Sequence, residues 1–223
     1  MNLYELFIQP YESYQSYQIV LEILATIFGL ISVYFSIKKN IWVYPTGIIS
    51  TGLYVYILYV FGLLGDSLIN IYYTIMSIYG WILWSQSSNS AGEVRISWAT
   101  KKDWIIASIL FVVSIGIVTT IYYYKPILDN QFSKNGIQLG LYHLDWANWL
   151  DIFITALLLI GMWLMAKRRI ENWIFWIVAD IISIPMYIYK GLGITSLQYL
   201  VFTIMAIIGY REWKKSFKKQ INN

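Results

Sequence analysis

A carboxylate lies deep in an apolar stretch of this chain, and two tryptophans share its helical face. Asp180 is near the middle of WIFWIVADIISIPMY, with Trp176 four residues before it and Trp173 three residues before that. A charge at the centre of a membrane helix costs about 2.5–3.5 kcal/mol, so the carboxylate should face a polar cavity or a partner. An indole beside a carboxylate suits a flat aromatic cation. The alternatives are a structural contact between helices for Asp180 and an interface anchor for Trp173.

Polar side chains recur in two further apolar stretches. Asn70 and Tyr73 are three residues apart in INIYYTIMSIYGW, which places them on one face of a helix. A buried amide needs hydrogen-bond partners or a polar ligand, and the alternative is an Asn that joins two helices. Gln198 and Tyr199 stand near the start of the last apolar stretch. These four residues are further candidates for binding a ligand.

The segment WVYPTG supplies the remaining candidates, Trp42 and Thr46. It holds a proline and a glycine within an apolar stretch, and these residue types free a backbone carbonyl and permit a hinge. An ordinary proline kink is the alternative. The substrate-binding residues that the sequence predicts are Trp42, Thr46, Asn70, Tyr73, Trp173, Trp176, Asp180, Gln198 and Tyr199.

Other kinds of chemistry lack the residues that they need. The chain has no cysteine and one histidine, His143, so neither a Cys–His pair nor a two-histidine metal site can form. No Gly-rich loop ends in Lys-Ser or Lys-Thr, which argues against a phosphate-binding loop. Asp180 has no evident acid–base partner at its depth. We therefore predict no catalytic residue, no metal, no cofactor and no enzyme activity.

Seven apolar stretches hold these residues, and each is close to the ~20 residues that cross a bilayer as a helix. Hydrophobic residues make up 58% of the 223 residues and charged residues only 13%, whereas a soluble domain carries about 25% charged residues. We predict an all-α integral membrane protein in a lipid bilayer. Its seven transmembrane helices are expected at 19–37, 41–61, 67–84, 104–124, 148–166, 173–189 and 195–212.

The basic residues favour one side of the predicted membrane. With seven spans, 13 of the 16 Lys and Arg residues fall on one side and three on the other. Under the positive-inside rule, this bias puts the N-terminus outside and the C-terminus in the cytoplasm. The formal net charge of +4 is small and its distribution follows the topology, so we predict no nucleic-acid partner.

The chain also repeats itself. Residues 62–84 and 191–213 align without a gap, and 10 of 23 positions are identical. The match continues upstream with a short gap, which places Trp42 opposite Trp173. Four spans separate the two copies, so both point the same way, as 3+1+3 parallel triple-helix repeats. The expected organisation is a lead-in at 1–18, a first repeat at 19–84, a connector with the fourth helix at 85–147, a second repeat at 148–213 and a basic cytoplasmic tail at 214–223.

The arrangement and its motifs resemble the PnuC family of bacterial vitamin transporters. The resemblance runs from about residue 20 to 213. Its most specific stretch is NWIFWIVADIISIPMYIYKGL at 172–192. Three further patterns support it, namely YxxxxxYGWxLW at 73–84, LDxFxTA at 150–156 and LxYxxFxxxAxxGYxxW at 197–213.

The resemblance implies a function. It implies uptake of nicotinamide riboside across the bacterial inner membrane by facilitated diffusion, with a cytoplasmic kinase that traps the substrate by phosphorylation. It also implies a SWEET-like fold, assembly as a homotrimer, and a site centred on Asn70, Trp176, Asp180 and Gln198. Nicotinamide riboside is a pyridinium cation with a polar sugar, which an indole, a carboxylate and two amides suit.

Several alternatives stay open at this point. Amides dominate in the riboside-specific members where this chain has Asp180, so thiamine is a second candidate cation, followed by riboflavin and deoxynucleosides. A membrane-embedded enzyme would need a pair of reactive groups at one depth. The membrane subunit of a larger importer would need an ATPase partner. Uptake by the chain alone would exclude the hypothesis that this chain is such a subunit.

Overall fold

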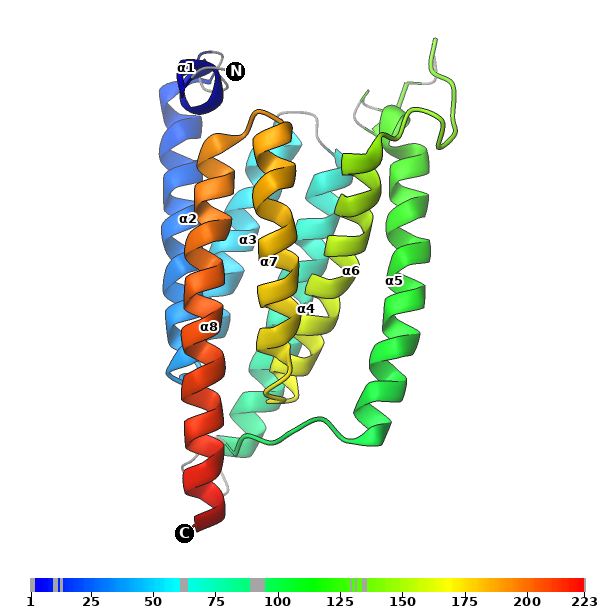
Figure 1. Ribbon diagram of the computed structural model, residues 1–223. Coiled ribbons are helices and arrows are strands. Elements are labelled where there is room, and N and C mark those ends of the chain that lie inside the picture. The colour runs from blue at the N-terminus through cyan, green and yellow to red at the C-terminus, as the bar shows by residue number, and fades with distance from the viewer. Residues whose placement is uncertain are drawn as a thin grey trace.

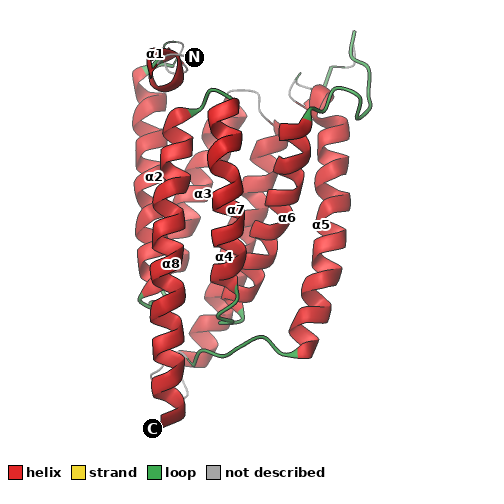
Figure 2. Cartoon of the chain, in the orientation of Figure 1, coloured by secondary structure: helices red, strands yellow, loops and turns green. Residues whose placement is uncertain are grey.

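The computed structural model describes residues 3–9, 12, 14–60, 64–88, 95–128, 130, 132–133 and 136–222. This part of the chain is helical, and its only pairing of β type is an isolated bridge between Ser97 and Arg169 (Figure 2). The predicted all-α class is therefore confirmed. The helices are α1 (Leu3–Phe7), α2 (Ser16–Ile37), α3 (Val43–Val60), α4 (Leu64–Ser88), α5 (Lys101–Leu128), α6 (Trp146–Ala166), α7 (Asn172–Tyr189) and α8 (Gly193–Asn222).

Six of the described helices are long and apolar enough to cross a membrane, namely α2, α3, α5, α6, α7 and α8. The remaining predicted span, 67–84, corresponds to α4. That helix has 25 residues, but Asn70 and its many tyrosines and tryptophans make it less apolar than the six. In the fold, α4 packs between α3 and α6 (Figure 1).

Six helices form a closed ring around the axis of the bundle. Helix α2 packs on α3, α3 on α4, α4 on α6, α6 on α7, α7 on α8, and α8 on α2. Helix α5 packs mainly on α6 and stands at the edge of the bundle (Figure 1). This order places α3 opposite α7 and α4 opposite α8, so that both halves of the chain face a common interior.

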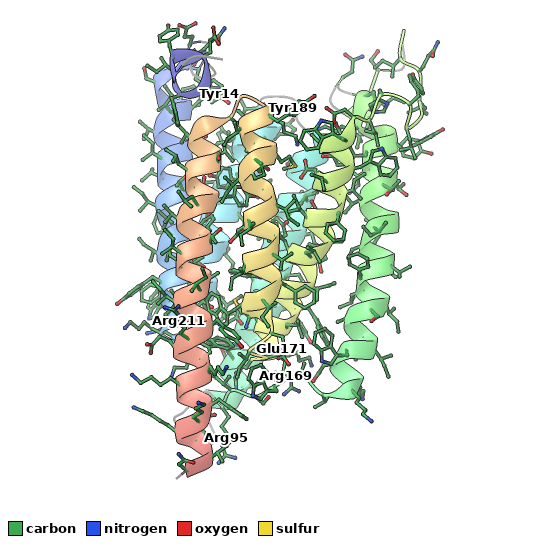
Figure 3. All side chains as sticks on the ribbon, viewed as in Figure 1. Tyr14, Arg95, Arg169, Glu171, Tyr189 and Arg211 are labelled. Atoms are coloured by element: carbon green, nitrogen blue, oxygen red, sulfur yellow. The ribbon has the colours of Figure 1, made fainter. Side chains whose placement is uncertain are left out.

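Basic residues gather at one end of the bundle. Figure 3 shows Arg95, Arg169 and Arg211 toward the end that holds the C-terminus, and Tyr14 and Tyr189 at the other end. We call these the basic end and the opposite end. Helix α8 runs to Asn222, so residues 214–222 of the predicted basic tail continue the last helix.

At the basic end, each half of the chain supplies a tryptophan that bonds to the other half. The indole N–H of Trp84 in α4 donates to the carbonyl of Ala166 in α6 at 3.2 Å. The indole N–H of Trp213 in α8 donates to the carbonyl of Ser36 in α2 at 2.9 Å. Both rings are buried, at 1% and 0% exposure, and their centroids lie 6.3 Å apart. The Ala166 carbonyl lies in the last turn of α6, where helical donors are lacking. The Ser36 carbonyl also accepts the Lys39 backbone N–H at 2.9 Å.

A second pair of contacts shows how the two halves correspond. The ring of Tyr44 lies against Gly80, and the ring of Trp173 lies against Gly209. A Cβ added at either glycine would come within 2.3 Å and 2.5 Å of the respective ring, so both positions require glycine. The sequence match places Trp42 opposite Trp173, but in the fold Tyr44 makes the contact that corresponds to that of Trp173.

Removing either indole N–H should destabilise the protein. Trp84→Phe should lower the free energy of unfolding by about 1–3 kcal/mol, because it leaves the buried Ala166 carbonyl without its donor. Trp213→Phe should lower it by about 0.5–1.5 kcal/mol, because the Ser36 carbonyl keeps the Lys39 backbone N–H. Thermal unfolding in detergent measures the loss. Trp81→Phe is the control, since its ring is 41% exposed, and it should change stability by less than about 0.5 kcal/mol. Equal losses in all three variants would contradict the role given to the two buried indoles.

Candidate substrate-binding site

Two neighbouring cavities lie inside the ring of helices. The indole cavity, named for Trp176, has a volume of about 210 Å³ and extends toward the basic end. The polar cavity, named for Asn70 and Gln198, has a volume of about 330 Å³ and extends toward the opposite end. All six helices of the ring contribute to each. The residues that line both are Gly29, Ser50, Thr51, Tyr73, Leu158, Tyr199 and Phe202. The shared lining makes the cavities adjoining chambers along the bundle axis.

Asp180 and Trp176 meet in the indole cavity, one helical turn apart on α7. Asp180 is 4% exposed, and its carboxylate has no hydrogen-bond or ion-pair partner among the residues that the structure describes. Within the same part of the chain, it is the only charged residue that lines this cavity. The buried indole N–H of Trp176 also lacks a partner there. An isolated buried carboxylate is costly, and a cationic ligand would offset that cost.

The indole of Trp176 is held in place from two sides. A Cβ added at Gly161 of α6 would lie 2.1 Å from the Trp176 Nε1, so the ring fits only against a glycine. The Trp173 ring packs at 5.8 Å and 66° to the Trp176 ring. Trp173 is 0% exposed and lines neither cavity. Trp173 therefore lies on the side of Trp176 away from the cavities, and it fixes the orientation of the Trp176 ring.

Asn70 and Gln198 line the polar cavity from α4 and α8, which are opposite helices of the ring. Tyr73 and Tyr199 line both cavities. Amides and phenols carry both donors and acceptors, as the hydroxyls of a sugar require. Six of the nine residues predicted to bind substrate thus line one or both cavities.

Trp42 and Thr46 lie away from the cavities, in and just before the first turn of α3. Trp42 is 58% exposed at the basic end. Thr46 is 7% exposed, and its hydroxyl donates to the Trp42 carbonyl at 2.7 Å. Neither residue lines the indole cavity or the polar cavity, and their role in binding stays a prediction.

Two further carboxylates, Glu22 and Asp151, line the polar cavity. Asp151 forms an ion pair with Lys190 at 2.9 Å and accepts a hydrogen bond from the Tyr122 hydroxyl at 2.6 Å. These two contacts join α5, α6 and the end of α7. No group of three or more His, Cys, Asp or Glu side chains within the described ranges could hold a metal ion. No Lys or Arg among the described residues lines either cavity.

One wall of the indole cavity was not predicted from the residue types. This wall, which we call the small wall after its small side chains, consists of small and hydroxyl-bearing residues on α2, α3 and α4. Single serines and glycines in apolar helices usually allow close helix packing, so nothing in the sequence distinguishes these from packing residues. The residues are Gly29, Ser32, Gly47, Ser50, Thr51 and Ser77.

Known proteins with similar sequences identify the family. The family model described as nicotinamide mononucleotide transporter matches residues 19–215. The chain belongs to the PnuC family. The nicotinamide riboside transporter PnuC of Escherichia coli (strain K12) is 26% identical over an alignment of 208 residues, and the match covers 90% of this chain and 87% of that protein. The nicotinamide riboside transporter PnuC of Neisseria mucosa is 28% identical over an alignment of 209 residues, and the match covers 87% of this chain and 72% of that protein.

Other PnuC relatives bear on the fold and on the choice of substrate. A crystal structure of the vitamin B3 transporter PnuC has a TM-score of 0.63 and 24% identity, and the match covers 90% of this chain and 83% of that chain. The riboflavin/roseoflavin transporter RibM of Streptomyces davaonensis is 21% identical over an alignment of 197 residues, and the match covers 86% of this chain and 83% of that protein. The chain is thus a membrane transporter of a vitamin-transporting family. Because the relatives are named for different vitamins, the substrate must be argued from the site.

Proposed function

We propose that this protein carries nicotinamide riboside into the cell. The main support is the Asp180 carboxylate, which faces the indole cavity beside Trp176 and has no partner among the described residues. A pyridinium is both flat and cationic, so it gains from stacking and from charge neutralisation. The neutral ring system of riboflavin would leave the buried carboxylate without a counter-charge, which is costly.

The sugar fits the polar cavity. A molecule with a cationic ring at one end and several hydroxyls at the other matches two adjoining chambers of different polarity. Asn70 and Gln198 then meet the ribose, with Tyr73 and Tyr199 beside the glycosidic bond. Thiamine is also a cation, but it has one hydroxyl and makes less use of two amides. These contacts favour the riboside over thiamine.

Nicotinamide mononucleotide, which carries a phosphate, should bind poorly. Three carboxylates, Glu22, Asp151 and Asp180, line the cavities, whereas no Lys or Arg within the described ranges does. A phosphate monoester carries a charge of about −1.5 to −2 at pH 7, and placing like charges side by side costs several kcal/mol. We expect the mononucleotide to bind at least about 100-fold more weakly than the riboside. Calorimetry on the purified protein measures the ratio, and equal affinities would contradict the proposed substrate.

In this proposal the riboside moves down its gradient, and no energy source is needed. The basic end faces the cytoplasm, where a kinase phosphorylates the riboside and prevents its return. Vesicles that contain the purified protein test this. Labelled riboside should equilibrate without exceeding the external concentration, and enclosed kinase with ATP should raise the trapped amount. Accumulation without kinase and ATP would contradict uncoupled transport, and a requirement for a partner ATPase would favour an importer subunit.

We also propose that 19–84 and 148–213 are parallel three-helix repeats in a seven-span, SWEET-like fold. Contacts at the same offset as the sequence match support this. Ser67 and Ser196 each donate to a carbonyl 12 residues earlier, at 3.2 Å and 3.1 Å. Lys39 and Arg168 follow corresponding helices, and each has a φ of 58°. One copy therefore supplies the small wall of the indole cavity and the other supplies Trp176 and Asp180.

Assembly and location follow the family in this proposal. Ile105, Ile109 and Val112 on α5 are 62%, 57% and 69% exposed, and such an apolar face needs cover from lipid or from another copy. The bacterial inner membrane and the homotrimer stay predictions. Crosslinking or mass determination in detergent would measure the number of copies.

A further inference from the structure

Two serine hydroxyls border a gap in the small wall of the indole cavity. Gly47 of α3 has no Cβ, and one added there would lie 3.1 Å from the Ser32 Oγ and 3.6 Å from the Ser77 Oγ. Both serines line the cavity, Ser32 from α2 and Ser77 from α4. Because α3 lies opposite α7 in the ring, this gap is across the cavity from Trp176.

The two hydroxyls have complementary capacity for hydrogen bonds. Ser77 is 5% exposed, and its hydroxyl has no hydrogen-bond partner within the part of the chain that the structure describes. Ser32 donates to the Val43 carbonyl at 2.7 Å, which leaves its oxygen as an acceptor. One hydroxyl can therefore donate to a ligand while the other accepts. Because Ser77 lines the cavity, its hydroxyl is available to a ligand there.

The other hydroxyls on this wall are already used by the fold. Ser50 donates to the Ala25 carbonyl at 2.7 Å. Thr51 donates to the Gly47 carbonyl at 3.0 Å and bonds to the Thr74 hydroxyl at 2.7 Å. Ser77 is thus the hydroxyl of this wall that stays available in the described structure.

We propose that Ser32 and Ser77 bind the carboxamide of the substrate, a subsite that rests on the proposed function. Ser77 donates to the carboxamide oxygen, and the carboxamide NH₂ donates to the Ser32 oxygen. The missing side chain of Gly47 gives the planar group room. Trp176 and Asp180 hold the cationic ring from the opposite wall. The hydroxyl pair therefore selects pyridinium ligands with a primary amide over those without one.

The test compares two ligands that differ only in this group. Nicotinamide riboside and ribosylpyridinium, which lacks the carboxamide, are titrated by calorimetry into the wild-type protein, Ser77→Ala and Ser67→Ala. Ser67 is a matched control because it lies on the same helix at 5% exposure, lines neither cavity and donates to the Val55 carbonyl.

Ser77→Ala should weaken binding of nicotinamide riboside about tenfold and change binding of ribosylpyridinium less than about twofold. Ser67→Ala should leave the ratio of the two affinities as in the wild type. Gly47→Ala is a second variant, since its Cβ fills the gap, and it should also weaken the riboside more than ribosylpyridinium.

Three outcomes would overturn the subsite. These are equal binding of both ligands by the wild-type protein, weakening of both by the same factor in Ser77→Ala, and no weakening of either in that variant. Failure of both ligands to bind the wild-type protein would instead overturn the proposed function, and the subsite with it. The two kinds of failure are therefore distinguishable.

Discussion

Asp180→Asn should weaken binding of nicotinamide riboside by about 100-fold. Two unit charges 4 Å apart attract by about 4 kcal/mol at an effective dielectric constant of 20, and desolvation of the cation removes part of this gain. A loss of about 2.7 kcal/mol, or 100-fold in affinity, remains. Asparagine keeps the shape of the side chain and removes only its charge. Calorimetry on the purified variant measures the effect.

Asp145→Asn is the matched control for this change. Asp145 caps α6 by accepting the Asn148 backbone N–H at 2.9 Å, and it lines neither cavity. Asparagine caps helices about as well as aspartate, so affinity should be unchanged. Wild-type affinity in Asp180→Asn would show that the carboxylate does not meet the cation. Tight thiamine binding that depends on Asp180 would keep the cation site but change the vitamin.

Gly161→Ala should weaken binding of the riboside at least about 30-fold through Trp176. The added Cβ would lie 2.1 Å from Nε1 and 2.2 Å from Cδ1 of that indole. The α6 backbone is fixed by its own hydrogen bonds, so the indole must move and loses its position beside Asp180. A desolvated cation–π contact is worth about 2 kcal/mol, which corresponds to about 30-fold.

Gly116→Ala is the control for this substitution. A Cβ added at Gly116 of α5 meets no atom within 4 Å, so riboside affinity should stay within about twofold of the wild type. The double variant Gly161→Ala, Trp176→Phe tests whether the clash is the cause, because a smaller ring should restore thermal stability without restoring affinity. Normal affinity in Gly161→Ala would mean that the Trp176 ring does not contact the substrate.

The sequence alone determined the helical class, the family and the residue pair that meets in the indole cavity. Each helix was predicted from its own apolar stretch of sequence, and each predicted stretch matches a helix of the fold. The family is confirmed by the model match over residues 19–215. Asp180 and Trp176 share a helical face whatever their surroundings, because four residues make about one turn. A carboxylate in an apolar helix must also avoid lipid, which directs it inward.

Only the tertiary structure decided which other residues face the cavities. Trp173 continues the stripe of Trp176 along α7, yet it packs against Gly209 behind that ring. Trp42 stands beside apolar sequence but is 58% exposed. Serine is a common packing residue between membrane helices, so its type does not mark Ser77 as a binding residue. Its place opposite α7 depends on how α3 and α4 are rotated about their own axes. That rotation results from contacts between helices far apart in the chain, so it cannot be predicted from the local sequence.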